Sequence, residues 1–216
     1  MNALLRYAVV KSLRDHLLAG LLLAPLVLTV SPMLGVAAIG AVRGDSFYPF
    51  HIPAATPAAT GSIFATVTAI VSAFVAGVGA FWIFRSEIAS RAVNFFFLAR
   101  HPRAVSGAST VYGFAAGMLA YGAARVSVAA LTASPQPAAK ELLTVTATIL
   151  IGSSLGSLLV AISAEPAILV PVYAGVMISS ISLLESADLQ RIAVAVAFAL
   201  ALIQAAPIVL RRRCAS

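Results

Sequence analysis

Few side chains in this sequence have a type and spacing that could catalyse a reaction. The candidates are Arg125, His16, His101 and carboxylates that are not grouped. The sequence holds no GxxxxGK[ST] loop for ATP phosphates, no HExxH zinc motif and no cluster of cysteines and histidines, since Cys214 is its only cysteine. We therefore expect a chain that is not an enzyme and binds no metal or other cofactor. Any ATP hydrolysis would belong to a partner subunit.

The elements that must position these side chains are strongly apolar. Of the 216 residues, 61% are hydrophobic and 10% are charged, and the mean hydropathy is +1.03. A soluble domain is about half apolar and about one quarter charged, so the composition predicts a polytopic membrane protein. The net charge of +7 does not imply nucleic-acid binding, because the basic residues lie in short segments that flank apolar runs.

Six apolar runs are long enough to span a membrane, and they predict an all-α fold in a single transmembrane domain over residues 1–216. The predicted spans are 17–41, 62–84, 105–132, 142–163, 167–184 and 192–210. Residues 2–16 carry apolar positions on one face and predict an amphipathic helix on the membrane surface. A cleaved signal peptide fits less well, because the following apolar run of 25 residues exceeds a typical signal sequence.

The basic residues predict the orientation. If both termini share one side, ten of the 14 lysines and arginines fall on that side: Arg6, Lys11, Arg14, Arg85, Arg91, Arg100, Arg103, Arg211, Arg212 and Arg213. Only Arg43, Lys140 and Arg191 fall on the other side, and Arg125 lies within a predicted span. The positive-inside rule therefore places both termini in the cytoplasm. Abundant alanine, and arginine in place of lysine, indicate a bacterial source and hence the inner membrane.

A charged segment, residues 85–104, separates the second and third predicted spans. As a helix it would pair Glu87 with Arg91 one turn later, and Pro102 would end it. Its other face would be apolar, with Ile88, Ala92, Phe95, Phe96 and Ala99. Such a short cytoplasmic helix suits contact with a soluble partner. The alternative interpretation is a basic interfacial loop that only anchors two spans.

Arg125 has two interpretations in the long third span. If the helix starts early, Arg125 reaches the outer surface and its guanidinium meets lipid phosphate or water. If the helix starts near Ser109, Arg125 lies inside the membrane. It would then contact an anionic part of a substrate or pair with Glu185 or Asp188.

Two GxxxG steps predict close helix packing. They are Gly113 with Gly117 in the third span, and Gly152 with Gly156 in the fourth. The central parts of the spans lack aspartate, glutamate and histidine, so the sequence does not favour a carrier driven by protons.

The layout resembles the permeases of type-2 ABC exporters: an amphipathic helix, two spans, a basic cytoplasmic helix and four more spans with a short inner turn. The local signature is Trp82, Phe84, Glu87, Leu98, Arg100 and Pro102. In that family the helix between the second and third spans is the coupling helix, which docks on a separate ATPase subunit, and two permeases pair around the export path. The resemblance implies a coupling helix at residues 86–101, with ATPase contacts at Glu87, Arg91, Phe95, Phe96 and Arg100.

We therefore expect a permease subunit that works as a homodimer or heterodimer in the lipid membrane with a separate nucleotide-binding ATPase, and in which Arg125 is a candidate substrate contact. The alternative is a non-transporting scaffold or assembly subunit that uses residues 85–104 to hold a soluble partner. A self-contained channel or carrier is the third hypothesis.

Overall fold

The fold comes from a computed structural model. It describes residues 2–15, 57–90, 101–132, 139–163, 165–171, 174–176 and 188–215, and the single positions 20, 23, 27 and 178. Within these residues all regular structure is helical and no strand occurs, which confirms the all-α prediction. The predicted span at 17–41 lies mostly outside the described residues, and half of the predicted span at 167–184 does.

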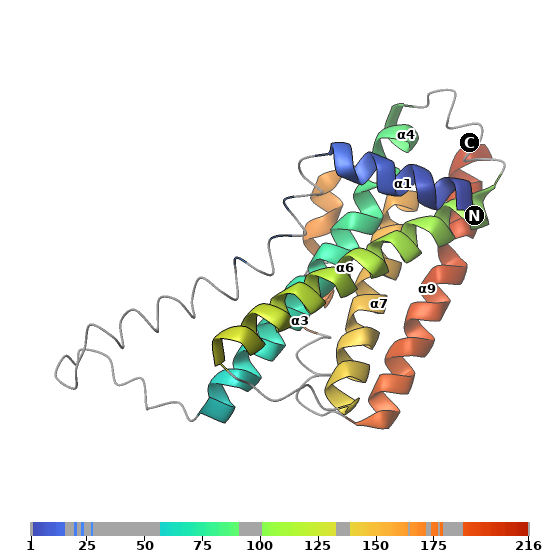
Figure 1. The fold of residues 1–216 in the computed structure, drawn as a ribbon. Helices are drawn as coiled ribbons and strands as arrows, with labels where there is room; N and C mark the ends of the chain where they lie inside the picture. The colour runs from blue at the N-terminus through green and yellow to red at the C-terminus, as the bar shows by residue number, and fades with distance from the viewer. Residues whose placement is uncertain are drawn as a thin grey trace.

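The described helices form a bundle with a short helix lying across one end (Figure 1). They are α1 (Asn2–Arg14), α3 (Pro57–Trp82), α4 (Arg85–Ser90), α6 (Pro102–Thr132), α7 (Ala139–Ile162), the 3₁₀ turn η1 (Pro166–Ile168) and α9 (Leu189–Ala215). Three helical stretches are long and apolar enough to cross a membrane: Thr66–Ala89, Ala139–Ile162 and Leu189–Arg213. A helix predicted at residues 2–16 is present as α1, and its position on a membrane surface stays a prediction.

Two helix starts differ from the sequence prediction, and a proline explains each. Pro57 opens α3 five residues before the predicted span at 62–84, and Pro102 opens α6 three residues before the predicted span at 105–132. A proline is favoured at the first helical position, because its missing N–H would have no partner there in any case. Of the helix predicted at residues 86–101, which Pro102 was expected to end, α4 covers the first part, and residues 91–100 lie outside the described part of the chain.

Small residues bring α3 into backbone contact with α6 and α7, which confirms the packing predicted from the two GxxxG steps. A Cβ atom on Gly117 would lie 2.8 Å from the carbonyl oxygen of Ser72. A Cβ atom on Gly152 or Gly156 would overlap a backbone carbonyl oxygen of α3, at Ala73 or Gly77. Only glycine allows helices to approach this closely, so α3 is held between α6 and α7.

Buried serines add hydrogen bonds between the same helices. The hydroxyl of Ser109 in α6 donates to the carbonyl oxygen of Ala80 in α3. The hydroxyl of Ser157 in α7 lies 3.2 Å from the carbonyl oxygen of Ser106 in α6, to which it donates. Hydrogen bonds of this kind stabilise helix association where no water competes for the donors, by about 0.6 kcal/mol on average.

The end of the bundle that carries α1 is called the α1 end below. There α3 ends, α6 begins, and α7 and α9 end, so the N- and C-termini of the chain lie close together (Figure 1). A buried apolar cluster joins these elements through Ala8, Phe81, Phe84, Ile88, Val105, Leu159 and Leu210. The guanidinium of Arg213 donates to the carbonyl oxygens of Val160, at 3.2 Å, and Ala161, at 3.5 Å, and so caps the last turn of α7.

Candidate functional site

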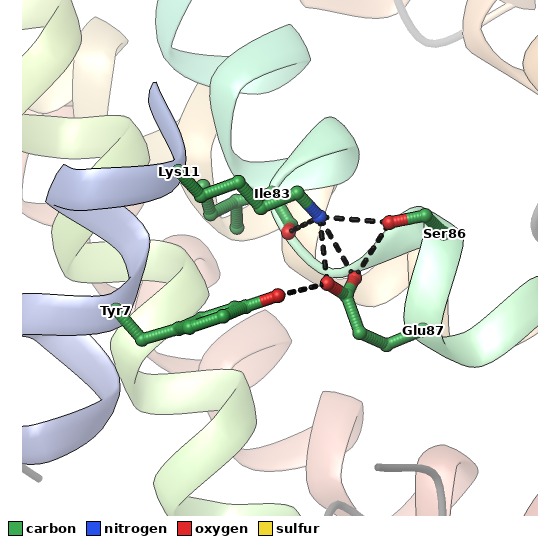
Figure 2. Close-up of polar contacts among 5 residues, drawn as sticks. All are labelled: Tyr7, Lys11, Ile83, Ser86 and Glu87. Atoms are coloured by element: carbon green, nitrogen blue, oxygen red, sulfur yellow. Dashed lines mark hydrogen bonds and ion pairs between the residues drawn. The ribbon is translucent and has the colours of Figure 1, made fainter. Parts of the chain in front are cut away.

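A polar cluster at the α1 end joins α1 to the junction between α3 and α4 (Figure 2). From α1 come Tyr7 and Lys11, which are four residues apart and therefore lie on the same face of the helix. From the junction come the carbonyl group of Ile83 and the side chains of Ser86 and Glu87. These five residues are called the α1–α4 cluster below.

Lys11 is the centre of the α1–α4 cluster. Its Nζ atom donates to the carbonyl oxygen of Ile83 at 2.6 Å, to Ser86 Oγ at 2.8 Å, and to both carboxylate oxygens of Glu87 at 2.8 Å. The Lys11 and Glu87 side chains are 19% and 9% exposed, so this ion pair is largely shielded from water. A shielded pair is screened less by salt than a surface pair.

Two hydroxyl groups also donate hydrogen bonds to the Glu87 carboxylate. Ser86 Oγ donates to Oε2 at 2.9 Å, and the Tyr7 hydroxyl donates to Oε1. Burial of the phenol, together with the hydrogen bond and the charge of Glu87, raises the pKa of Tyr7 from its ordinary value of 10.0 to about 12. Tyr7 therefore remains a protonated donor over the whole physiological pH range.

The local chain geometry explains why these groups meet. Helix α3 ends at Trp82, and a two-residue turn at 83–84 leads into α4 at Arg85. The last carbonyls of a helix lack intrahelical donors and carry partial negative charge, so the Lys11 ammonium is favoured beside Ile83. Glu87 lies in the first turn of α4, where a negative charge is favoured.

Aromatic side chains support the turn. The ring of Tyr7 stacks on that of Phe84, with centroids 6.4 Å apart and planes 15° apart. The guanidinium of Arg85 lies 4.6 Å from the ring centroid of Trp82, a cation–π contact. Ile83 and Phe84 are fully buried. The polar groups of the α1–α4 cluster thus lie next to buried apolar and aromatic side chains.

The structure places only some of the predicted ATPase contacts. Glu87 is buried and holds α1, and its neighbour Ile88 is in the core rather than on an open apolar face. Arg91, Phe95, Phe96 and Arg100 lie outside the described residues, and the pairing of Glu87 with Arg91 stays a prediction.

The partners that Glu87 has in the structure, Tyr7 and Lys11, were not singled out in the sequence. A signal for them exists. A carboxylate next to a membrane span needs a counter-charge, and Lys11 is one of two lysines in the chain.

Arg125 lies at the opposite end of the bundle. Because α6 begins at Pro102, Arg125 follows the start of the helix by 23 residues, a rise of about 35 Å, which exceeds the ~30 Å hydrocarbon core of a bilayer. This is the early helix start of the two alternatives. Arg125 Nη1 is 3.7 Å from Oε1 of Glu141 in the first turn of α7, and the Tyr121 hydroxyl donates to the same oxygen at 3.4 Å.

Glu141 is therefore the counter-charge of Arg125 in the structure. The carboxylate of Asp188, which was one predicted partner, instead accepts the backbone N–H of Gln190 at 3.1 Å. Glu185, the other, lies outside the described residues.

The sequence was expected to hold no GxSxG hydrolase motif, and this expectation is wrong, because one serine in α7 matches that pattern. Residues 152–156 read Gly-Ser-Ser-Leu-Gly, which fits GxSxG with Ser154 as the nucleophile. That pattern is catalytic on a sharp turn between a strand and a helix, where the serine is exposed. Ser154 is fully buried within α7, and its hydroxyl donates to the carbonyl oxygen of Leu150 at 2.6 Å. The pattern here serves helix packing.

The fold is that of an all-helical protein with three helices able to cross a membrane. In the described part of the chain, no three histidine, cysteine, aspartate or glutamate side chains gather as a group that could hold a metal ion. Comparisons with protein-family models, with curated proteins and with solved structures found no match. The α1–α4 cluster joins α1 to the junction between α3 and α4.

Proposed function

We propose that this chain is the transmembrane permease subunit of an ABC exporter in a bacterial inner membrane. It would have six spans, both termini in the cytoplasm, a second permease as its partner, and a separate ATPase subunit docked at residues 86–101. The observation that carries the proposal is the α1–α4 cluster, in which Lys11 and Tyr7 fasten the surface helix to the start of that segment. Contacts between helices far apart in the chain are what a force-transmitting element requires.

The proposed mechanism assigns two tasks to the coupling segment. Glu87 anchors the segment to α1, and Arg91, Phe95, Phe96 and Arg100 contact the ATPase. Closure of the ATPases would push on this segment and hence on α3, which continues into it after a two-residue turn. Because α3 is in close backbone contact with α6 and α7, a displacement of α3 would also displace these two helices.

The charges of the described residues support the proposed orientation. At the α1 end lie the basic residues Arg6, Lys11, Arg14, Arg85, Arg103, Arg211, Arg212 and Arg213. At the opposite end lie Arg125, Lys140 and Arg191. The positive-inside rule assigns the α1 end to the cytoplasm, where an ATPase subunit would be.

Co-purification with an ATPase tests the proposal. The full chain is expressed with the ATPase subunit encoded next to its gene, and complex formation and ATP hydrolysis are measured in proteoliposomes. We expect Phe95→Ala with Phe96→Ala to weaken the complex and its ATP turnover, while the exposed control Arg14→Gln leaves both unchanged. Unchanged complex and turnover in the phenylalanine variant would contradict the docking site. Recovery of a soluble partner without ATPase activity would favour the scaffold hypothesis instead.

A further inference from the structure

A basic cavity lies at the α1 end, separate from the α1–α4 cluster. It has a volume of about 680 Å³ and is formed between the start of α6 and the last part of α9. Its walls include His101, Arg103, Ala104, Gln204, Pro207 and Arg211. Arg213, two residues beyond Arg211, turns away to cap α7 and is not part of the wall.

The polar groups of the cavity are suited to an anion. Arg103 and Arg211, which line the cavity, each carry a guanidinium with five N–H donors and no acceptor, and within the described part of the chain no aspartate or glutamate lines it. The first turn of α6 also lies in the wall at Arg103 and Ala104, where backbone N–H groups have no intrahelical acceptor and carry partial positive charge. Planar guanidinium groups and a helix N-terminus together match the oxygens of a phosphate group.

The wall formed by α9 continues as an exposed stripe whose apolar members are Leu200 and Ile208. Leu200, Gln204, Ile208 and Arg211 are spaced at four, four and three residues, so they lie on one face of the helix, and all are exposed. Leu200 and Ile208 are 53% and 57% exposed, and buried Pro207 adds an apolar floor to the cavity. A ligand that fits both parts is anionic at one end and apolar along its length.

The position of the cavity along the membrane normal fits the headgroup of a lipid. Arg211 follows Leu189, the first residue of α9, by 22 residues, which corresponds to a rise of about 33 Å and so to the thickness of the hydrocarbon core. A headgroup in the cavity would therefore be at the membrane surface while its acyl chain lies beside Leu200. Basic pockets between helices at this depth are a recurrent form of site for anionic headgroups.

We propose that this cavity binds the phosphate of an anionic phospholipid whose acyl chain lies along the Leu200, Gln204 and Ile208 face of α9. Phosphatidylglycerol has the required single negative charge. Phosphatidylcholine carries a quaternary ammonium that the two arginines would repel. The site does not depend on the proposed transport function, because it uses none of the residues of the α1–α4 cluster.

Native mass spectrometry of the purified full chain in detergent tests the site with three probes: phosphatidylglycerol, phosphatidylcholine and inorganic phosphate. We expect saturable binding of phosphatidylglycerol and at least about tenfold weaker binding of phosphatidylcholine. Inorganic phosphate at millimolar concentration should not displace the lipid, because it gains nothing from the α9 stripe. Displacement by phosphate, or equal binding of both lipids, would overturn the proposal.

Variants locate the site. Arg103→Gln with Arg211→Gln should weaken phosphatidylglycerol binding by about tenfold or more, since each arginine offers charge-assisted hydrogen bonds. The matched control Arg14→Gln with Arg212→Gln removes the same charge from two exposed residues outside the cavity and should change binding less than about twofold. Equal weakening in both pairs would show diffuse attraction to the basic end and overturn the site.

A single, nearly isosteric change gives an independent measurement. Gln204→Glu places a carboxylate in the wall of the same cavity at an exposed position, so it repels a phosphate bound there without removing a packed side chain. It should also weaken phosphatidylglycerol binding by about tenfold. Retention of the wild-type affinity by Gln204→Glu would overturn the proposal even if the double arginine variant failed to fold.

Discussion

Replacing Lys11 by methionine is the most direct test of the α1–α4 cluster. Methionine keeps most of the apolar stem but removes the ammonium, while the hydroxyls of Tyr7 and Ser86 still donate to the Glu87 carboxylate. Loss of one partner of a buried ion pair costs about 3–5 kcal/mol. Because the Lys11 side chain is 19% exposed and two donors remain, we expect a smaller loss of about 2–3 kcal/mol.

The assay is thermal unfolding of the purified full chain in detergent. A loss of this size corresponds to a decrease in Tm of about 5–10 °C for a chain of this length. The control is Arg14→Met, which removes an exposed cation from the last turn of the same helix and should change the free energy of unfolding by less than about 0.5 kcal/mol. A Lys11→Met variant as stable as Arg14→Met would refute the reasoning.

A double variant distinguishes loss of the Lys11–Glu87 ion pair from a general destabilisation of α1. Glu87→Gln added to Lys11→Met removes the uncompensated charge, so the double variant should be more stable than Lys11→Met alone by about 1 kcal/mol or more. Strictly additive losses from the two single changes would show that Lys11 and Glu87 do not stabilise each other.

Four further predictions concern other contacts. Tyr7→Phe should cost about 1–1.5 kcal/mol, and because the pKa of Tyr7 is raised from 10.0 to about 12, this difference should be constant in melts below pH 10 and vanish only as the pH rises through 12. Gly156→Val should prevent close packing on α3 and abolish recovery of folded protein, whereas Gly122→Ala, with open space around it, should raise Tm slightly. Under the proposed function, Arg125→Lys and Arg125→Ala should keep normal abundance and export, because Arg125 pairs with Glu141 and not with a substrate. Loss of export in both variants at normal abundance would instead indicate a substrate contact. Cys214 should resist a membrane-impermeant thiol reagent in intact cells, and labelling would show the proposed orientation to be wrong.

The parts of the fold that could be predicted from sequence are those governed by local pattern. The amphipathic α1, the apolar helices and the glycine faces all follow from composition and spacing within a single segment. Helix starts were less accurate. Pro57 and Pro102 are compatible both with a loop and with a first helical turn, and only packing decides between them.

The polar contacts could not be predicted for a different reason. Local spacing suggested Arg91, which lies outside the described residues, as a partner of Glu87, and it gave no sign of Lys11, which the structure joins to Glu87 from 76 residues away in the chain. In the same way Arg125 joins Glu141, across the connection between α6 and α7. Long side chains reach many neighbours, so their pairing depends on how the helices are placed, and a single sequence does not specify that placement.

The three consecutive arginines at the end of α9 act at two different times. During membrane insertion, under the proposed orientation, Arg211, Arg212 and Arg213 act together as a retention signal that keeps the end of α9 from being translocated. After folding they no longer act as a unit, because Arg213 holds the end of α7 and Arg211 lines the basic cavity. A change from arginine to lysine would therefore preserve biogenesis while impairing the mature protein, so normal insertion is no guarantee of a correctly closed bundle.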